Sequence, residues 1–290
     1  MAVLPMDICL LPPSDDRVFK RLLVSPEAKP ALMDLISAVI KLPVIDVAIR
    51  NNELPLGDVE EKAERLDLNC VTDSGIQIDI EMQASHIKEV LGGNHKNLKG
   101  KSIYYLCDLH SSQSSKGKSY DELARTYQIT FCAYTVFFKR EEFVNSYSMR
   151  HDIDNELLSD ALHVVFVELS KLSEIVKKPV DQMTDLEKWA IFFRYADLPE
   201  YREIANEVIN SKEVLKVAGT LLTEISQDER ERAIFRSRKM YQSDLESNLI
   251  TAQRETAFAI AKNMIKRNRP IDEIIEDTGL TREQVEGLLL

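Results

Sequence analysis

The stretch AERLDLNCVTDSGIQIDIEMQ, residues 63–83, decides the fold of this chain. Residues 76–83 alternate apolar and polar side chains strictly, which is the period of a β-strand with two unlike faces. Residues 63–71 also alternate, and a turn signal, TDSG at residues 72–75, joins the two runs. Two strands joined by a short Asp/Gly turn form a β-hairpin. The sequence therefore predicts a hairpin over residues 63–83.

The two faces of the second predicted strand differ in chemistry. One face carries Ile76, Ile78, Ile80 and Met82, and the other carries Gln77, Asp79, Glu81 and Gln83. A hairpin can bring Asp67 of the first strand and Glu81 of the second together on one face of the sheet. Divalent cations such as Mg²⁺ bind one or two carboxylates and keep several waters. Because a bound cation activates water and stabilises developing negative charge, the pattern indicates a candidate site for phosphodiester hydrolysis.

A second interpretation of the same pattern has no catalytic content. Alternating polar residues on an antiparallel hairpin usually form its solvent face. On that interpretation, Asp79 is a surface carboxylate and not the ligand of a second metal ion. The spacing of the residues leaves both interpretations open.

Outward from the hairpin, the sequence predicts an α/β fold, with a mixed sheet flanked by helices. Helices are expected where apolar residues recur every three to four positions, and strands where β-branched and aromatic residues cluster. The predicted helices include residues 17–23, 31–40, 102–110, 229–266, 271–277 and 281–286, and the further predicted strands are residues 44–50, 126–138 and 161–169. The apolar run at 126–138 is long enough for a central strand, and the chain after residue 170 is expected to be helical.

Charge is unevenly distributed along the chain. The 290 residues carry 37 Lys and Arg against 48 Asp and Glu, a formal net charge of −11, which argues against a protein that coats nucleic acid by bulk charge. Counted by segment, residues 1–85 have a net charge of −7, residues 86–140 have +5 and residues 141–290 have −9. The middle segment is therefore a basic island, either a solvated lysine loop or a surface that faces phosphates.

The cysteines and the hydropathy pattern exclude other classes of protein. The four cysteines form no CxxC pair, so we expect neither a zinc knuckle nor a redox motif. We expect reduced thiols, as in a cytoplasmic protein. The most apolar N-terminal stretch, residues 31–49, is interrupted by charges and a proline and is too broken to span a bilayer. We therefore expect a cytoplasmic protein with no membrane partner.

The motifs around the hairpin resemble those of a known nuclease family. The block RLD at residues 65–67 and IEMQ at residues 80–83 resembles the core motif of the PD-(D/E)XK nuclease family transposases, the recombination-promoting nucleases. There, an Asp is followed across a hairpin turn by Glu-x-Gln. Further segments resemble the family in order along the chain: Asp16 to Lys20, Lys101 to Tyr105, Gly117 to Tyr120, Glu168 to Lys171, and the helical tail at residues 274–288.

The resemblance implies a fold and a set of metal ligands. The fold is a restriction-endonuclease-like PD-(D/E)XK core followed by a mostly helical C-terminal region. Asp67 and Glu81 would hold Mg²⁺ or Mn²⁺, with the carbonyl of Met82 completing the site. Gln83 occupies the place of the lysine of the superfamily, and its amide carries no charge. Lys101 stands where the family has Arg, and it, Lys99 or Lys88 would supply the missing positive charge; the exchange loses bidentate phosphate geometry and keeps the charge.

The resemblance also implies DNA as the partner. The expected reaction is metal-dependent endonucleolytic hydrolysis of DNA, linked to transposition or recombination in a bacterial cell. The candidate DNA-contacting residues are Lys88, Lys99, Lys101, Tyr105, Lys116 and Lys118, and the accessory candidates are Asp16, Lys20 and Asp79. Asp16 would serve as an outer-sphere ligand, or Asp15 or Asp16 would cap the first helix.

The sequence predicts three segments, and two alternative functions remain beside the nuclease. Residues 1–150 would form the nuclease-like domain, residues 151–225 an extension packed on it, and residues 226–290 a long helix with a helix–turn–helix-shaped tail. The last predicted helix is too acidic for a recognition helix, so we expect the tail to pack or to form a homodimer through the C-terminal helices. The rivals are a nuclease-fold DNA- or protein-binding module without turnover and an acidic helical adaptor.

Overall fold

The computed structural model describes residues 4–50, 68–84, 96–114 and 119–289. The chain divides into two compact units. Among the described residues, the first unit ends at Arg236 and the second begins at Ser237, within one helix. Each unit is treated by itself below. Within the described residues, no helix is long and apolar enough to cross a membrane.

The first unit is built on a mixed six-stranded sheet, counted over the described residues. Its order is β1-β2-β3-β4-β6-β5, and β3, β4 and β6 run parallel to one another. The strands are β1 (Val47–Ile49), β2 (Leu68–Thr72), β3 (Gln77–Gln83), β4 (Thr126–Cys132), β5 (Val144–Arg150) and β6 (Leu157–Glu168). The sheet places β3 and β4 at its centre, and the predicted α/β class is confirmed.

The predicted hairpin is formed by β2 and β3. The two strands are antiparallel, with Leu68 opposite Ile80 and Asn69 opposite Asp79. The turn closes because the backbone N–H groups of Gly75 and Ile76 both donate to Thr72, to its carbonyl at 2.9 Å and to its hydroxyl at 3.1 Å. Gly75 has a φ of 84°, a conformation that favours glycine over residues with a side chain. The local sequence therefore specifies this turn.

The predicted central strand at 126–138 is wrong in length. β4 ends at Cys132, and the chain turns away over residues 133–143 before β5 begins. The backbone N–H groups of Val136 and Phe137 donate to the Glu168 carboxylate, at 2.6 and 3.0 Å, and not to a neighbouring strand. An apolar, β-rich sequence cannot reveal this, because the competing acceptor lies about 30 residues further along the chain.

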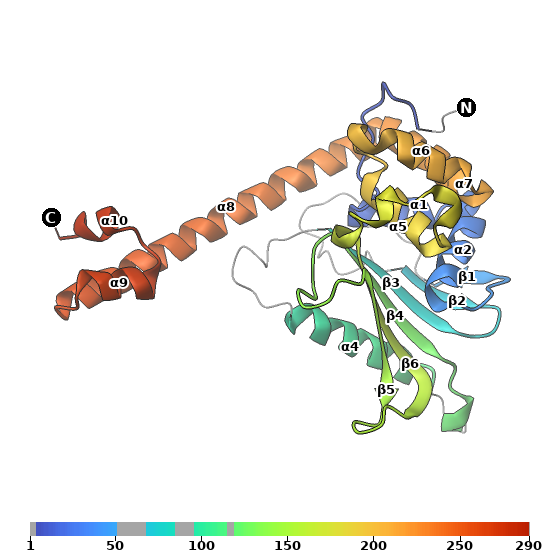
Figure 1. The fold of residues 1–290 in the computed structure, drawn as a ribbon, viewed down its shortest axis with the longest axis horizontal. Helices are drawn as coiled ribbons and strands as arrows, with labels where there is room; N and C mark the ends of the chain where they lie inside the picture. Colours follow the sequence, from blue (N-terminus) through green and yellow to red (C-terminus); the bar gives the residue numbers. More distant parts are fainter. Residues whose placement is uncertain (1–3, 51–67, 85–95, 115–118, 290) are drawn as a thin grey trace. The chain divides into compact units, whose positions relative to one another are not determined.

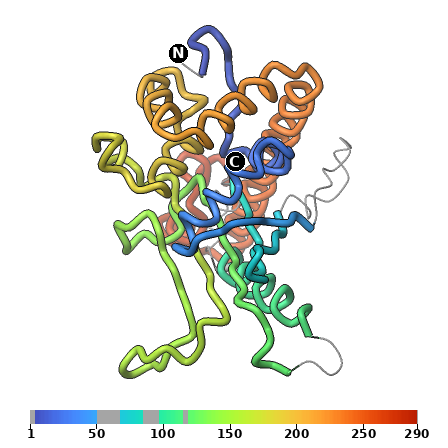
Figure 2. The backbone as a smooth tube through the Cα atoms, turned by 90° about the vertical axis from the view of Figure 1, so that its right-hand side faces the viewer, coloured from blue at the N-terminus to red at the C-terminus, as the bar shows by residue number. Residues whose placement is uncertain are grey.

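Helices cover the two faces of the sheet (Figure 1). The helices of the first unit are α1 (Asp16–Leu23), α2 (Lys29–Ile40), α4 (Lys96–Ser111), α5 (Asp185–Tyr195), α6 (Arg202–Asn210) and α7 (Glu213–Gln227). α4 lies on one side of the sheet, and α1, α2 and α5 lie on the other. The turn between β5 and β6 projects away from α6 and α7 in both perpendicular views (Figure 1 and Figure 2).

The main core lies between the apolar face of the sheet and α1 and α5. Phe19 of α1, Phe131 of β4 and Phe193 of α5 meet there, with ring centroids 5.1 to 5.8 Å apart. Trp189 is fully buried next to them, and its indole N–H donates to Asp34 of α2 at 2.9 Å. This aromatic cluster joins the helical layer to the central strands.

The second unit contains the tail. α8 (Glu229–Lys266) begins in the first unit and continues into the second, followed by α9 (Ile271–Thr278) and α10 (Arg282–Glu286). α10 begins with a capping box, in which the side chains of Thr281 and Gln284 each accept the other residue's backbone N–H. A small apolar core holds these helices together: Ala261, Ile274, Leu280 and Val285. The helix–turn–helix shape is therefore a locally packed unit.

We expect Phe131→Ala to lower the free energy of unfolding by about 3–5 kcal/mol, because it removes a fully buried ring from the main core. Urea denaturation would measure the change. Phe138→Ala is the matched control, because the Phe138 ring is 74% exposed and its loss should leave stability within about 0.5 kcal/mol. An equal loss for both variants would contradict the assignment of the core.

Candidate active site

The polar face of β3 is buried, so the interpretation of this face as a solvent face is wrong. Gln77, Asp79 and Glu81 are 4 to 5% exposed. The cause is α4, which packs across this face and hydrogen-bonds to β4. His110 on α4 lies 2.8 Å from the Thr126 hydroxyl. Burial of carboxylates is costly unless they are paired or bind a cation, so this strip of the sheet requires compensating groups.

Glu81 is the carboxylate for which such groups are visible. Its Oε1 accepts hydrogen bonds from the Lys101 ammonium and from the Gln83 side-chain amide. The Glu81 side chain is 5% exposed, and that of Lys101 is 34% exposed. The Oε2 atom is buried and has no hydrogen-bond partner within the part of the chain that the structure describes. The structure thus brings together three of the predicted site residues: Glu81, Gln83 and Lys101.

α4 positions Lys101 and its basic neighbours. The Lys101 ammonium lies 5.2 Å from the ring centroid of Tyr105, one helical turn further along. Lys99 places its ammonium 4.4 Å from the ring centroid of Phe137, in the segment after β4. Tyr105 is half-buried and Tyr104 is 67% exposed, so neither tyrosine belongs to the core. The amino half of α4 therefore sets two lysines beside Glu81 and the end of β4.

The structure also places the two accessory carboxylate candidates, Asp79 and Asp16. Asp79 lies opposite Asn69 on one side and Gln128 on the other, inside the polar face, so it is not a surface carboxylate. Asp16 accepts the backbone N–H of Arg17 at 2.7 Å, and Asp15 is the N-cap of α1, accepting from Arg17 and Val18. These bonds satisfy the free N–H groups at the start of α1.

Other predicted residues lie elsewhere or cannot be placed. Lys20 is fully buried on α1. The Met82 side chain faces the apolar side of the sheet next to Glu81, and the candidate ligand at this position is its backbone carbonyl. Asp67, Lys88, Lys116 and Lys118 lie outside the described residues.

The described residues supply part of a ligand set for a divalent cation. A buried carboxylate oxygen without a hydrogen-bond partner, the Oε2 of Glu81, is the kind of donor that Mg²⁺ prefers. Within the described ranges, no group of three or more His, Cys, Asp and Glu residues could hold a metal ion. Mg²⁺ needs only one or two carboxylates because it retains waters. Glu81 together with one further carboxylate is therefore a sufficient set.

Two cysteines near these carboxylates are poor nucleophiles. Burial, reinforced by the charges of Glu168 and Glu81, raises the pKa of the Cys132 thiol well above its ordinary value. Burial and the charge of Asp79 raise the pKa of Cys70 to about 12. Since the thiolate is the reactive form, the raised pKa values disfavour Cys70 and Cys132 as nucleophiles at neutral pH.

Glu168 and Lys171 form a clamp that the sequence did not predict as part of the site, at the edge of the sheet where β3 also ends. Glu168, at the end of β6, is fully buried. Besides the two backbone N–H groups at 136 and 137, its carboxylate accepts from Asn145 at 2.8 Å and from Lys171 at 2.7 Å. Lys171 also donates to the Phe137 carbonyl at 2.9 Å. The Glu-Leu-x-Lys segment at 168–171 was the available sequence signal, and the structure gives it the task of holding the segment after β4.

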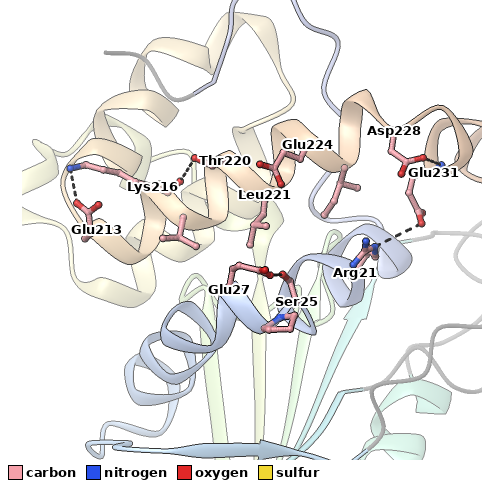
Figure 3. Close-up of a pocket in the computed structure, with 13 residues that line it drawn as sticks. Arg21, Ser25, Glu27, Glu213, Lys216, Thr220, Leu221, Glu224, Asp228 and Glu231 are labelled. Carbon is pink, nitrogen blue, oxygen red and sulfur yellow. Dashed lines mark hydrogen bonds and ion pairs between the residues drawn. The ribbon is translucent and has the colours of Figure 1, made fainter.

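A groove elsewhere on the first unit is unsuited to DNA (Figure 3). It has a volume of about 770 Å³ and lies between α1 with its following turn and α7 with the start of α8. Five carboxylates and two cations line it: Glu27, Glu213, Glu224, Asp228, Glu231, Arg21 and Lys216. This excess of negative charge would repel a phosphate backbone.

One protein family matches the chain. The sequence model described as PD-(D/E)XK nuclease family transposase covers residues 13–252, which include β3, α4 and all strands of the sheet. The resemblance inferred from the motifs is confirmed. No curated protein and no solved structure matches the chain.

We expect Glu168→Gln to lower the free energy of unfolding by about 3 kcal/mol, because it removes the charge from a buried carboxylate with four hydrogen bonds. Chemical denaturation would measure it. Glu174→Gln is the matched control, since Glu174 and Lys177 form an ion pair of the same i,i+3 spacing that is 80% and 66% exposed. Equal stability of the two variants would argue against the clamp.

Proposed function

We propose that this chain, which belongs to the PD-(D/E)XK nuclease family transposases, is a Mg²⁺-dependent endonuclease that hydrolyses DNA phosphodiester bonds at the face carrying Glu81. One observation carries the proposal. Glu81 is a buried carboxylate with one oxygen held by Lys101 and Gln83 and the other without a hydrogen-bond partner in the described residues. Such an arrangement orients one oxygen toward a cation and supplies a positive charge beside it.

Asp67 is proposed as the second carboxylate. It precedes Leu68, the first residue of β2, and Leu68 pairs with Ile80, the neighbour of Glu81. Glu81 and Asp67 would hold Mg²⁺, with the carbonyl of Met82 as a further candidate ligand. When bound, the ion would acidify a coordinated water and neutralise charge that develops on the phosphate.

The superfamily places a lysine at the position of Gln83, and here Gln83 and Lys101 together take over its functions. The Gln83 amide donates to Glu81 and fixes the orientation of the carboxylate, but it brings no charge. The Lys101 ammonium brings the charge, and its side chain is 34% exposed, so it can reach a phosphate in solvent. An ammonium binds phosphate as a point charge, without the paired geometry of a guanidinium.

The contact with DNA would extend along the basic segment. Lys99 and Tyr105 lie on the same helix as Lys101, and Lys88, Lys116 and Lys118 complete the proposed set. Because the whole chain is acidic, this contact depends on a few cations and should weaken steeply with salt. We further propose, from the family, a role in transposition or recombination, and retain a homodimer through the C-terminal helices as a prediction.

We expect Glu81→Gln and Asp67→Asn each to lower plasmid nicking roughly 100-fold or more, because each removes a metal-binding charge. Lys101→Ala should lower nicking on the order of 100-fold, and Lys101→Arg should restore much of it because the charge returns. Nicking of supercoiled plasmid in Mg²⁺ measures all four variants, and Glu174→Gln should nick like wild type. Unchanged nicking by Glu81→Gln would contradict the assignment of the site.

Removal of the metal separates the proposed nuclease from a binding module. Chelation should abolish nicking, and added Mg²⁺ or Mn²⁺ should restore it, since the ion supplies the activated water. Calorimetry should show Mg²⁺ binding by the wild type and loss of that binding in Glu81→Gln. Mg²⁺ binding without any turnover would favour the binding module, which the uncharged Gln83 permits.

A further inference from the structure

The segment after β4 leaves the sheet beside the candidate active site. In the parallel strands, Gln83, Cys132 and Glu168 stand side by side at the carboxyl edge. The N–H of Ala133, the first residue after β4, donates to the Gln83 carbonyl at 3.0 Å. Residues 133–143 therefore begin next to the strand end that carries Glu81.

This segment is held in one conformation by side chains from β6 and the turn after it. Glu168 accepts two of its backbone N–H groups, and Lys171 donates to the carbonyls of Phe137 at 2.9 Å and Glu142 at 3.4 Å. The hydroxyls of Thr135 and Ser170 lie 2.9 Å apart. A fixed backbone can present a side chain without first paying the entropy of ordering it.

The clamped segment forms a tight turn whose tip points into solvent. The N–H of Arg140 donates to the Phe137 carbonyl at 3.2 Å, which puts Phe138 and Lys139 at the corner of a turn. Phe137 faces inward, with its ring 5.3 Å from that of Phe166 and 5.7 Å from that of Tyr147. Phe138 is 74% exposed, and Lys139 and Arg140 are exposed beside it.

The charge around this tip favours a polyanion. Lys99 of α4 lies over the Phe137 ring at the base of the turn, and Lys139 and Arg140 follow the exposed Phe138 along the chain, so the turn is associated with three cations. Glu141 and Glu142 follow the tip, so the positive charge is confined to residues 139–140 and to the amino end of α4. An exposed aromatic ring flanked by cations matches a nucleic acid, which offers base faces between phosphates. A purely apolar partner would not need the cations.

We infer that the turn at residues 137–140 is a DNA-contacting tip, in which Phe138 stacks on or inserts against a base next to the cleaved bond. Lys139 and Arg140 contact the flanking phosphates. Aromatic wedges of this kind unstack a base step and position the backbone. The inference rests on the proposed DNA substrate and adds to it a residue that holds the strand by a base while Glu81 faces the phosphate.

Binding should be measured in the Glu81→Gln background, so that cleavage does not consume the probe. The probes are a short fluorescein-labelled DNA duplex, single-stranded oligo(dT), and duplexes with 2-aminopurine at successive positions. Adding Phe138→Ala should weaken binding about 10-fold, because the contact between ring and base is lost. It should also abolish the rise in 2-aminopurine fluorescence, because the base step is no longer unstacked. Adding Phe138→Trp should retain both. Ile153→Ala, which removes an 87% exposed apolar side chain, is the control and should bind unchanged.

The cations have their own readout. Replacing Lys139 and Arg140 together by alanine should reduce the slope of log affinity against log salt by about 2, since two phosphate contacts are lost. Phe138→Ala should leave this slope unchanged. An unaltered slope in the double alanine variant would overturn the assignment of the cations.

The outcomes distinguish this inference from the proposed nuclease. Equal affinity and equal 2-aminopurine response with and without Phe138→Ala would overturn the inference, even if the wild type cleaves DNA. A wild type that never cleaves DNA, combined with a response lost in Phe138→Ala, would overturn the nuclease and support the tip.

Discussion

The burial of the polar face of β3 beneath α4 is the constraint on which the rest of the site depends. A carboxylate in this position, 5% exposed, is stable only if other groups compensate its charge. Lys101 and Gln83 do so for one oxygen of Glu81, and the other oxygen is available to a cation. The same burial would strengthen every electrostatic interaction with a substrate, because water is largely excluded. Protein stability and the proposed chemistry therefore make opposite demands on this one side chain.

Parallel pairing of β3, β4 and β6 supplies the second half of the arrangement. Parallel strands end at the same edge of a sheet, so segments separated by tens of residues leave the core side by side. Here that edge gathers Gln83, the segment after Cys132, and Glu168. Glu168 and Lys171 then form a buried pair whose bonds go to backbone groups of residues 136–142. The pair fixes a turn near the site and leaves Phe138 in solvent.

Part of the candidate site could be predicted from the sequence because Glu81 and Gln83 lie close together along the chain. Glu81 and Gln83 share a face through the period of two, and Lys101 was identified through the family motif. The fate of Asp79 could not be predicted. Alternation says that two faces differ but does not say which face another element will cover, and α4 covers the polar one here. The length of β4 was missed for a similar reason, since Glu168 takes the N–H groups that a longer strand would have used.

The sequence by itself determined the local features. These are the hairpin and its turn at Gly75, the boundaries of α8, and the capping box of Thr281 and Gln284. Each depends on interactions within a few residues, which periodicity and turn chemistry report directly. Only the tertiary structure decided that Lys101 would meet Glu81, that Glu168 would hold the turn at Phe137, and that Phe138 would face outward. Those outcomes depend on packing across the sheet between distant segments, and packing leaves no periodic trace in the sequence.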